Sequence, residues 1–429
     1  MRFAFYTLGC KTNQYETQAM EHILQNQGHE IGHFDEKCDA YIINTCSVTA
    51  IADKKNRAMI RRCRREHPGA LIGVCGCYTQ HDPETVRSLG VDVLGGSGGR
   101  QVFLEDLTAA LEGKAHTDHL DNALGRREFE ILPPGGLEER TRAMLKVQDG
   151  CVNFCTYCII PYARGPVRSL PMDKAAEQVR ALRAQGYREI VVTGIEISSY
   201  GHDLKDGTTL IDLLELIARE GGEMRIRLGS LEPRTVTREF CERAKKLPTL
   251  CPHFHLSMQS GCDATLKRMN RKYDTARYYE SVELLREYFD DPAITTDLIT
   301  GFPEETEEEF GETLAFIEKC GFAAMHIFPY SIRPGTKAAA MAQVDMSVRE
   351  ERAARAAAVA ERMHQGYLAR CVGKTFPVLF EQDRGEGSVG HAPNYMPVTV
   401  DVKGLHNTVQ NVRITAVDGD GLRGEPEET

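Results

Sequence analysis

The chain has 429 residues, of which 41% are hydrophobic and 27% are charged, and its formal net charge is −10. This length predicts about three domains, and the composition is that of an ordinary globular protein. The negative charge argues against broad nonspecific nucleic-acid binding, so any basic patch must be local.

Neither a membrane span nor a secretory leader is expected. No stretch approaches the roughly 18 apolar residues of a spanning helix, and the apolar run Phe3–Leu8 is too short for a signal peptide. We therefore expect a cytoplasmic protein with no membrane partner. In that reducing compartment, 14 cysteines favour metal ligands over disulfides.

Residues 1–112 alternate short apolar runs with polar helical stretches, a pattern typical of a parallel sheet covered by helices on both faces. The expected strands are Phe3–Leu8, Ala40–Asn44, Leu71–Cys75 and Val91–Gly95. The expected helices are Gln14–Gln25, Asp53–Arg65 and Pro83–Leu89.

One cysteine follows each of the first three strands: Cys10, Cys46 and Cys77. Ligands gather at the carboxyl ends of parallel strands, so these strand-end cysteines could meet and hold a metal cluster. The alternative is that they are ordinary buried cysteines of a core. Spacing alone leaves both readings open.

Residues 113–136 have the composition of a linker, and a second alternation follows in residues 137–370. Six strands are expected: Met144–Gln148, Glu189–Thr193, Arg225–Gly229, His253–Met258, Ile294–Ile299 and His326–Tyr330. Helices between them are Asp173–Gln185, Leu210–Arg219, Thr237–Leu247, Asp274–Phe289 and Glu305–Lys319. Six such repeats predict a partial barrel with its chemistry at the carboxyl-end loops.

The loop after the first of these strands contains Cys151, Cys155 and Cys158. Three thiolates at this spacing can bind three irons of a 4Fe–4S cluster and leave the fourth iron open to a small ligand. A structural zinc site usually has four ligands in two close pairs, and no fourth Cys or His follows closely. A zinc site and three free thiols are thus the weaker alternatives for these motif cysteines.

The remaining chain reads as a long helix, Ser347–Arg370, followed by a small all-β barrel in residues 371–429. Its expected strands are Phe376–Glu381, Gly387–Ala392, Met396–Val402 and Thr408–Ala416. The polar, acidic end Gly419–Thr429 is expected to be disordered.

The motif cysteines, with Tyr157 before the last of them, resemble the signature of the radical S-adenosylmethionine (SAM) superfamily. The whole chain resembles the methylthiotransferases of that superfamily, whose closing barrel is called a TRAM domain. The segments that carry the resemblance are Thr7–Glu16, Asn44–Cys46, Gly76–Gln80, Cys151–Cys158 and Ile160–Gly165. The fold class implied is α/β: a parallel α/β domain, a radical SAM partial (βα)6 barrel and a TRAM-like barrel.

The resemblance implies two 4Fe–4S clusters and SAM as cofactors. The motif cysteines would hold the cluster that cleaves SAM, with Tyr157 beside the adenine, and Cys10, Cys46 and Cys77 would hold an auxiliary cluster. Cys75 is not a family ligand position and reads as a buried strand residue. Gly194 and Gln259, which follow later strands, are further candidates for cofactor binding.

Within the family, Lys11–Glu16 and Tyr330–Thr336 look most like the branch that methylthiolates C2 of N6-threonylcarbamoyladenosine beside the anticodon of tRNA. Replacing an unreactive C–H by C–S–CH3 requires a radical route, which the cofactor supplies and the protein positions. The alternatives are isopentenyl-adenosine in tRNA, an aspartate of a ribosomal protein, and a noncatalytic iron–sulfur protein that binds RNA.

The expected partners are tRNA, a flavodoxin- or ferredoxin-like reductant and an unidentified sulfur donor. Residues 371–429 have five basic against nine acidic residues, a net charge of −4, although phosphate contact favours a basic surface. The strongest basic run is in the helix Asp53–Arg65, so Arg61, Arg62 and Arg65 are predicted to contact tRNA. The alternative is a solvated helix face.

Overall fold

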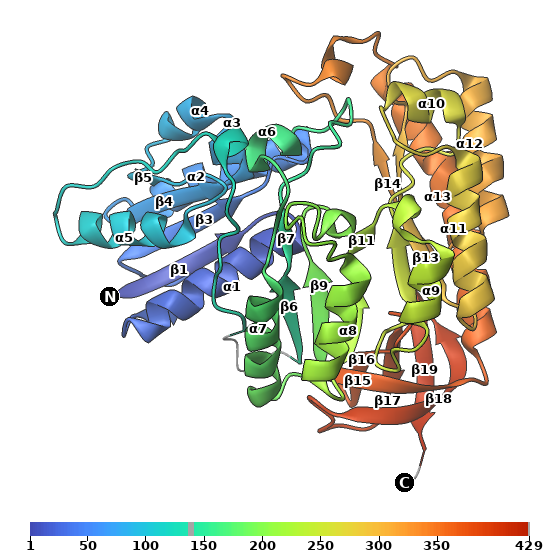
Figure 1. Cartoon of the computed structure of the whole chain (residues 1–429). Helices are drawn as coiled ribbons and strands as arrows, with labels where there is room; N and C mark the ends of the chain where they lie inside the picture. Colours follow the sequence, from blue (N-terminus) through green and yellow to red (C-terminus); the bar gives the residue numbers. More distant parts are fainter. Residues whose placement is uncertain (136–140, 428–429) are drawn as a thin grey trace.

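The computed structural model describes residues 1–135 and 141–427. The expected boundary between linker and central domain, at residues 136 and 137, therefore lies outside the described residues. Three parts are visible: a sheet with helices near the N-terminus, a larger curved sheet with an outer layer of helices, and a small barrel near the C-terminus (Figure 1).

The N-terminal sheet is parallel, with strand order β2-β1-β3-β4-β5. Its strands are β1 (Arg2–Thr7), β2 (Glu30–Gly32), β3 (Ala40–Thr45), β4 (Leu71–Gly76) and β5 (Val93–Leu94). Its helices are α1 (Lys11–Asn26), α2 (Ala50–Glu66), α3 (Cys77–His81), α4 (Pro83–Arg87) and α5 (Arg100–Leu111). Sequence patterns did not predict β2 or α5.

Helices cover both faces of this sheet, as the alternation predicts. Leu24 of α1 and Phe103 of α5 pack on one face, whereas Ile60 of α2 packs on the other. The central strand β3 is buried at every residue because it has helices on both sides. A short helix η1 (Ala123–Gly125) interrupts the predicted linker.

The central part has its strands in sequence order around a curved sheet. These strands are β6 (Arg142–Lys146), β9 (Glu189–Thr193), β10 (Arg225–Leu228), β11 (Ser230–Leu231), β12 (His253–Leu256), β13 (Ala293–Thr300) and β14 (Ala324–Pro329). Gly229 separates β10 from β11, so hydrogen-bonded pairing splits into the groups β10-β9-β6 and β11-β12-β13-β14. All these pairs are parallel, as expected for a partial (βα)6 barrel.

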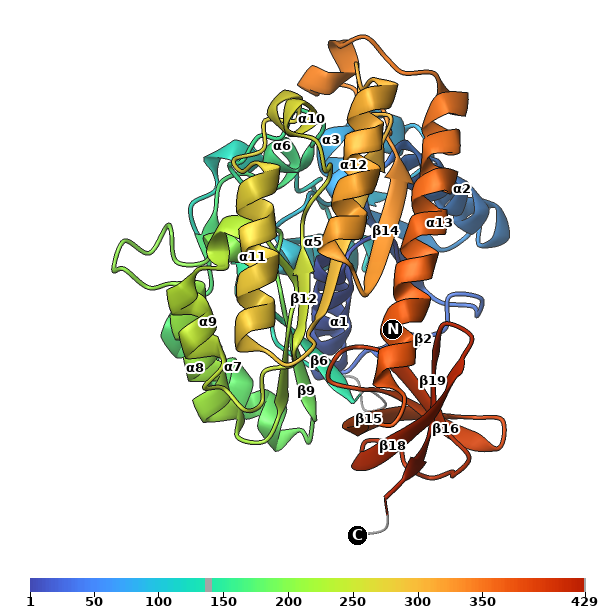
Figure 2. The same ribbon diagram turned by 90° about the vertical axis from the view of Figure 1, so that its right-hand side faces the viewer.

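Helices form the outer layer of this partial barrel (Figures 1 and 2). They are α7 (Met172–Ala184), α8 (Leu210–Gly221), α9 (Arg238–Ala244), α10 (Asp263–Arg268), α11 (Thr275–Tyr288), α12 (Glu307–Cys320) and α13 (Met346–Cys371). Shorter elements lie in the loops: β7 (Gln148–Asp149), α6 (Ile160–Arg164), β8 (Arg168–Ser169), η2 (Ile197–Ser199), η3 (Pro233–Thr235) and η4 (Lys337–Ala340).

The last part is a closed barrel in the order β15-β16-β17-β19-β18. Its strands are β15 (Thr375–Arg384), β16 (Gly387–His391), β17 (Pro397–Val400), β18 (Val409–Asp418) and β19 (Gly421–Pro426). The predicted disorder of Gly419–Thr429 is therefore wrong for β19. Its acidic residues suggest a solvated tail, but Leu422 is buried in the barrel core and β19 pairs with β18 through a tight turn.

The small barrel packs below the central part, against the end of α13 (Figure 2). Its core includes Tyr367 and Leu368 of that helix, which also contributes Ala356 and Val359 to the core of the central part. In the part of the chain that the structure describes, no helix is long and apolar enough to cross a membrane.

Candidate active site

The motif cysteines lie in the loop after β7, whose backbone is held in a fixed shape. Gly150 has a φ of +77°, and a Cβ there would lie 1.9 Å from the Pro166 carbonyl oxygen. Only glycine fits this position. The Thr156 amide donates to the Met269 carbonyl at 3.0 Å, and Asn270 Nδ2 donates to the carbonyls of Asn153 and Phe154.

The three thiols of this loop lie close together, and Arg271 lies beside one of them. Burial, and then the Glu196 carboxylate and the Cys155 thiol, raise the pKa of Cys151 to about 11, and burial followed by the Cys155 thiol raises that of Cys158 to about 12. Arg271 Nη1 donates to Cys155 Sγ at 3.3 Å. Such thiols ionise readily only when a metal compensates their charge, so the three sulfurs fit a cationic iron cluster.

The strand-end cysteines also converge, at the carboxyl edge of the N-terminal sheet. Cys10 follows β1, Cys46 follows β3 and Cys77 begins α3. Gly9, with a φ of +101°, lies so close to Cys46 that a Cβ on it would be 2.7 Å from Cys46 Sγ. Burial and then the Cys77 thiol, with a further effect of Cys10, raise the pKa of Cys46 to about 12.

The chemistry of this second donor set is again that of three sulfurs around a metal cluster. Cys46 and Cys77 are buried, while Cys10 is exposed toward the neighbouring cavity. Cys75 lies inside β4 in the apolar core, as expected for a residue that is not a ligand. Among the described residues, no three His, Cys, Asp or Glu side chains are grouped closely enough to hold a single metal ion.

A buried network of charges lies between the two cysteine sets. Arg164 of α6 donates from Nε to Cys77 Sγ at 3.1 Å and from Nη2 to Asn13 at 2.9 Å, and its guanidinium also pairs with Glu16. Glu16 further pairs with Arg100 at 2.6 Å and Lys146 at 2.8 Å.

This network continues to the residue before the motif loop. Lys146 also pairs with Asp149 at 2.7 Å, and Asp149 accepts a hydrogen bond from the Gly150 amide at 2.8 Å. Burial alone would raise the pKa of Glu16, but its surrounding cations hold it well below the ordinary range. Sequence analysis missed this network because its members are distant along the chain.

Two adjoining cavities join the cysteine sets to the partial barrel. The central cavity, of about 720 Å³, is lined by Cys10, Gly194 and His255 among others. The side cavity, of about 210 Å³, is lined by Tyr157 and Gln259 among others. Asp297 and Phe328 line both, so the two cavities adjoin. The predicted residues Tyr157, Gly194 and Gln259 therefore line adjoining cavities.

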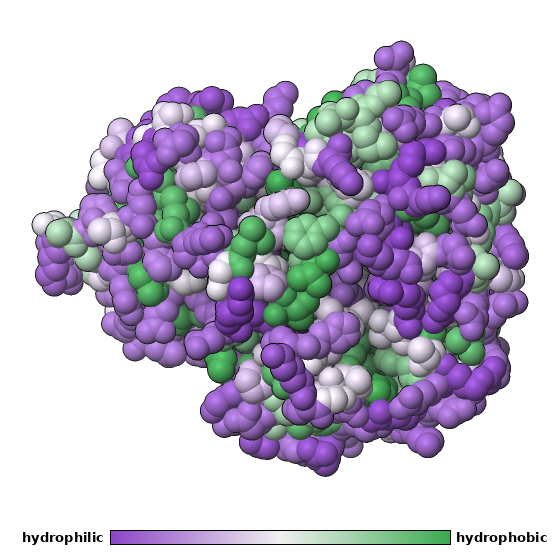
Figure 3. Space-filling model, turned by 45° about the horizontal axis from the view of Figure 1, so that its top comes forward, coloured by the Kyte–Doolittle hydropathy of each residue, from purple (hydrophilic) through white to green (hydrophobic). Residues whose placement is uncertain are grey.

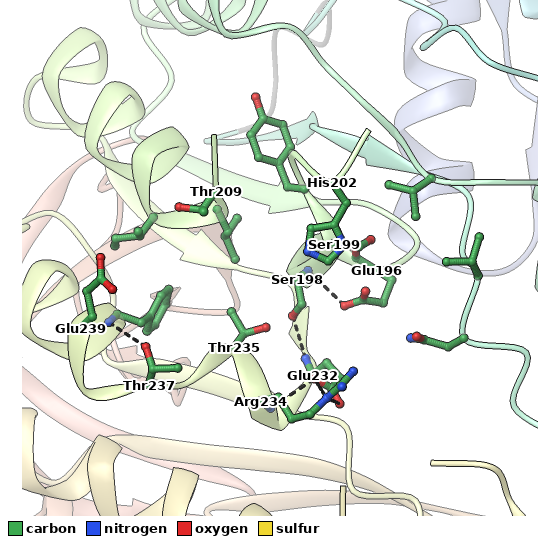
Figure 4. A pocket seen from close by; sticks show the side chains of 17 residues that line it. Glu196, Ser198, Ser199, His202, Thr209, Glu232, Arg234, Thr235, Thr237 and Glu239 are labelled. Atoms are coloured by element: carbon green, nitrogen blue, oxygen red, sulfur yellow. Dashed lines mark hydrogen bonds and ion pairs between the residues drawn. The ribbon is translucent and has the colours of Figure 1, made fainter. Parts of the chain in front are cut away.

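A third cavity, of about 400 Å³, lies against the motif loop at Asn153. Figure 4 shows the side chains of Glu196 and Glu232, which follow β9 and β11, together with Ser198 and Arg234. Ser198 links the two carboxylate-bearing loops, since its amide donates to Glu196 and its hydroxyl accepts from the Glu232 amide. Both glutamates follow strands of the partial barrel, as do the predicted residues Gly194 and Gln259.

The loop after Cys46 is clamped by a segment of the central part. Arg333 pairs with Asp53 at 2.7 Å and donates to Ser47 Oγ at 2.7 Å. The Ala50 amide donates to Ser331 Oγ at 2.9 Å. These contacts place Tyr330–Thr336, one of the segments that suggested the substrate branch, directly beside the second cysteine set.

The predicted RNA contacts on α2 differ in their availability. Arg62 pairs with Asp35 and Glu66 at 3.0 and 2.8 Å, and Arg65 pairs with Glu66 at 3.1 Å. Arg61 is exposed, and within the described residues it has no carboxylate partner. The same holds for Lys54 and Lys55. Contact between this helix and tRNA phosphates stays a prediction. Lys54, Lys55 and Arg61, called the α2 cations below, are the basic residues of the helix that are most available for it.

Comparison with known proteins identifies relatives over most of the chain. The radical SAM superfamily model matches residues 145–317, and the model described as "Uncharacterized protein family UPF0004" matches residues 2–95. The chain is 40% identical to the threonylcarbamoyladenosine tRNA methylthiotransferase MtaB of Bacillus subtilis, over 92% of this chain and 89% of that protein. It is 32% identical to the tRNA-2-methylthio-N(6)-dimethylallyladenosine synthase of Pelotomaculum thermopropionicum, over 90% and 89%.

The fold resembles that of solved radical SAM proteins. The radical SAM methyltransferase TsrM from Kitasatospora setae, solved with cobalamin and a [4Fe-4S] cluster bound, superposes with a TM-score of 0.60. The superposition covers 79% of this chain and 77% of that one, at 15% identity. At this identity the likeness establishes the α/β fold and nothing about the substrate.

Proposed function

Because this chain belongs to the radical SAM methylthiotransferase family, we propose that it adds a methylthio group to C2 of N6-threonylcarbamoyladenosine next to the anticodon of tRNA. Relatives named for this substrate match at 31–40% identity, four of them at 36–40%. The reaction would take place in the cytoplasm, with a flavodoxin- or ferredoxin-like reductant and a separate sulfur donor as partners.

The observation that carries the proposal is that a residue from each of the two cysteine-bearing regions lines one of two adjoining cavities. Cys10 faces the central cavity and Tyr157 the side cavity, and the two cavities share Asp297 and Phe328. A substrate base in this space would lie between the two donor sets. A site that only transfers electrons would not require cavities of this size.

We assign one 4Fe–4S cluster to the motif cysteines and a second to Cys10, Cys46 and Cys77. When bound, the clusters and SAM supply the electron, the radical, the sulfur and the methyl group. The protein residues hold and orient these groups. Arg271 neutralises charge at Cys155, Arg164 does so at Cys77, and the polar pocket of Figure 4 suits the hydroxyls and amine of a nucleoside such as SAM.

The surface around the cavities is suited to binding tRNA. Figure 3 shows apolar side chains gathered in the hollow between the N-terminal and central parts. Phe154, Tyr162 and Phe328 are exposed by 41%, 48% and 45%. Unstacked bases of a single-stranded loop bind to such aromatic faces, while the α2 cations could contact the phosphates.

The chief alternative substrate is isopentenyl-adenosine, because synthases of that branch match at 32–34% identity. A noncatalytic iron–sulfur protein that binds RNA is the alternative from another class. Mass analysis of nucleosides from the tRNA of cells with and without this protein separates them. Loss of the methylthio group from threonylcarbamoyladenosine alone is expected. Loss from isopentenyl-adenosine, or no loss, would refute the proposal.

A further inference from the structure

A pocket of about 340 Å³ adjoins the central cavity on the side of the small barrel. It is lined by three cations that come from separate parts of the chain: Lys11, the first residue of α1; Arg142 of β6; and Arg227 of β10. Lys11 and Tyr395 line both this cationic pocket and the central cavity. A group bound here is therefore within reach of a base held beside Cys10.

The three cations surround one aromatic ring. The guanidinium carbons of Arg227 and Arg142 lie 4.7 and 5.6 Å from the Tyr395 ring centroid, and Lys11 Nζ lies 6.0 Å from it. The ring is fixed by stacking on His391, with a centroid distance of 4.9 Å. Tyr395 itself is in the left-handed region, with a φ of +70°, so its position is specified by the surrounding structure.

Positive charge exceeds negative charge in this group. Glu189 pairs with Arg225 and Arg227 at 2.6 and 2.8 Å, and Glu381 pairs with Arg142 at 2.8 Å. Glu381 also accepts from His391 at 2.7 Å. The group thus contains two carboxylates and four cations, which are Lys11, Arg142, Arg225 and Arg227.

Among the described residues, Lys11 is the cation of this group that has no carboxylate partner. No ion pair to it exists within the described residues, and its side chain is exposed to the cavity. An anion bound here would offset the excess positive charge that Lys11, Arg142 and Arg227 bring to the pocket. The amino end of α1 adds a partial positive charge at the same place.

We propose that the cationic pocket binds the carboxylate of the threonylcarbamoyl group and that Lys11 is a specificity-determining residue. This inference rests on the proposed function. The N6 substituent of this nucleoside ends in a carboxylate and carries a hydroxyl, whereas an isopentenyl group is wholly apolar. Gln14, Thr141 and Gln382 also line the pocket and offer hydrogen bonds to the hydroxyl.

The test uses the reconstituted enzyme and anticodon stem-loop RNAs that differ only at the target base. One RNA contains the threonylcarbamoyl group with a free carboxylate, a second contains its methyl ester, and a third contains unmodified adenosine. All have the same phosphates. The wild-type protein should bind the free acid about 10- to 100-fold more tightly than the ester, as expected for a hydrogen bond between charged groups.

Lys11→Met should bring the ratio of acid to ester affinity close to one, while Lys11→Arg keeps most of the preference. Lys245→Met, a matched change of an exposed lysine after α9, should leave the ratio unchanged. Iron content and reductive SAM cleavage should be normal in all three variants. Because Lys11 makes no ion pair within the described residues, the Lys11→Met protein should fold. If that variant loses iron, the Lys11→Gln variant is assayed in its place.

Equal weakening of all three RNAs by Lys11→Met would mean that Lys11 contacts phosphate, and an unchanged ratio would mean that it contacts nothing relevant. Either result overturns the inference. Loss of SAM binding would assign Lys11 to SAM and overturn it as well. A wild-type protein that binds the free acid tightly but never methylthiolates it would instead refute the proposed function, because the binding assay requires no turnover.

Discussion

Glu16→Gln should be among the most destabilising single changes in this protein. Glu16 is 1% exposed and pairs with Arg100, Lys146 and Arg164. Removing its charge leaves three buried cations with Asp149 as the remaining buried carboxylate of the network. Breaking a buried ion pair usually costs about 3–5 kcal/mol, and the loss of three partners at once places Glu16→Gln at the upper end.

The assay is urea unfolding of the cluster-free chain, followed by far-UV circular dichroism because the chain has no Trp. Glu287→Gln is the matched control: Glu287 forms an exposed pair with Arg238, and such pairs contribute about 0–1 kcal/mol. A Glu16→Gln protein that unfolds at the same urea concentration as Glu287→Gln would refute the reasoning.

The effect should also depend on pH. The pKa of Glu16 in the folded protein is held well below the ordinary value of 4.5, so folding favours its charged form. The stability that this charge provides is complete above pH 4.5 and is lost as the pH falls toward the lowered pKa. The difference between wild type and Glu16→Gln should therefore be full at pH 7 and shrink progressively below pH 4.5.

Three further outcomes test the site. Anaerobic reconstitution should give close to eight irons per chain, and changing the three motif cysteines to Ala should leave about half; a variant that keeps all its iron or none contradicts two separate sites. Cys46→Ala should still cleave SAM but form no methylthio product, and a folded variant without cleavage would contradict the division of roles. Changing Lys54, Lys55 and Arg61 to Glu should weaken tRNA binding, and the slope of log affinity against log salt concentration should fall by roughly one for each lost phosphate contact. The double change Lys403→Glu and Arg413→Glu in the small barrel should have a smaller effect. A larger effect of the barrel variant would favour the small barrel as the phosphate-binding part.

The proximity of the cysteines within each set was predictable from local rules, whereas the assignment of the strand-end set to a cluster depends on the family resemblance and stays a prediction. Cys10, Cys46 and Cys77 each follow a strand, and parallel neighbouring strands end at one edge of a sheet. The motif cysteines are close in sequence and need no fold to be recognised. The same rules located the six main strands of the partial barrel, since each is a short apolar run between helical stretches.

The cationic pocket and the buried network were not predictable in this way. Lys11, Arg142, Arg227 and Tyr395 are separated by up to hundreds of residues, and each alone has the appearance of an ordinary surface or strand residue. The failure at β19 has a different origin. Charged residues dominate the composition of Gly419–Thr429, whereas one buried apolar side chain, Leu422, anchors β19 in the barrel core.

The position of the buried network suggests why a protein of this kind keeps charges in its interior. Glu16 and Arg100 belong to the N-terminal part, whereas Lys146, Asp149 and Arg164 belong to the central part. Apolar residues would hold the two parts together at least as well, because ion pairs lose hydration on burial. Apolar contacts tolerate small shifts, however, whereas hydrogen-bonded charges are satisfied in few arrangements. Arg164 bonds to Cys77, and Asp149 bonds to the amide that precedes Cys151, so an arrangement that satisfies the network also fixes the two cysteine sets relative to each other.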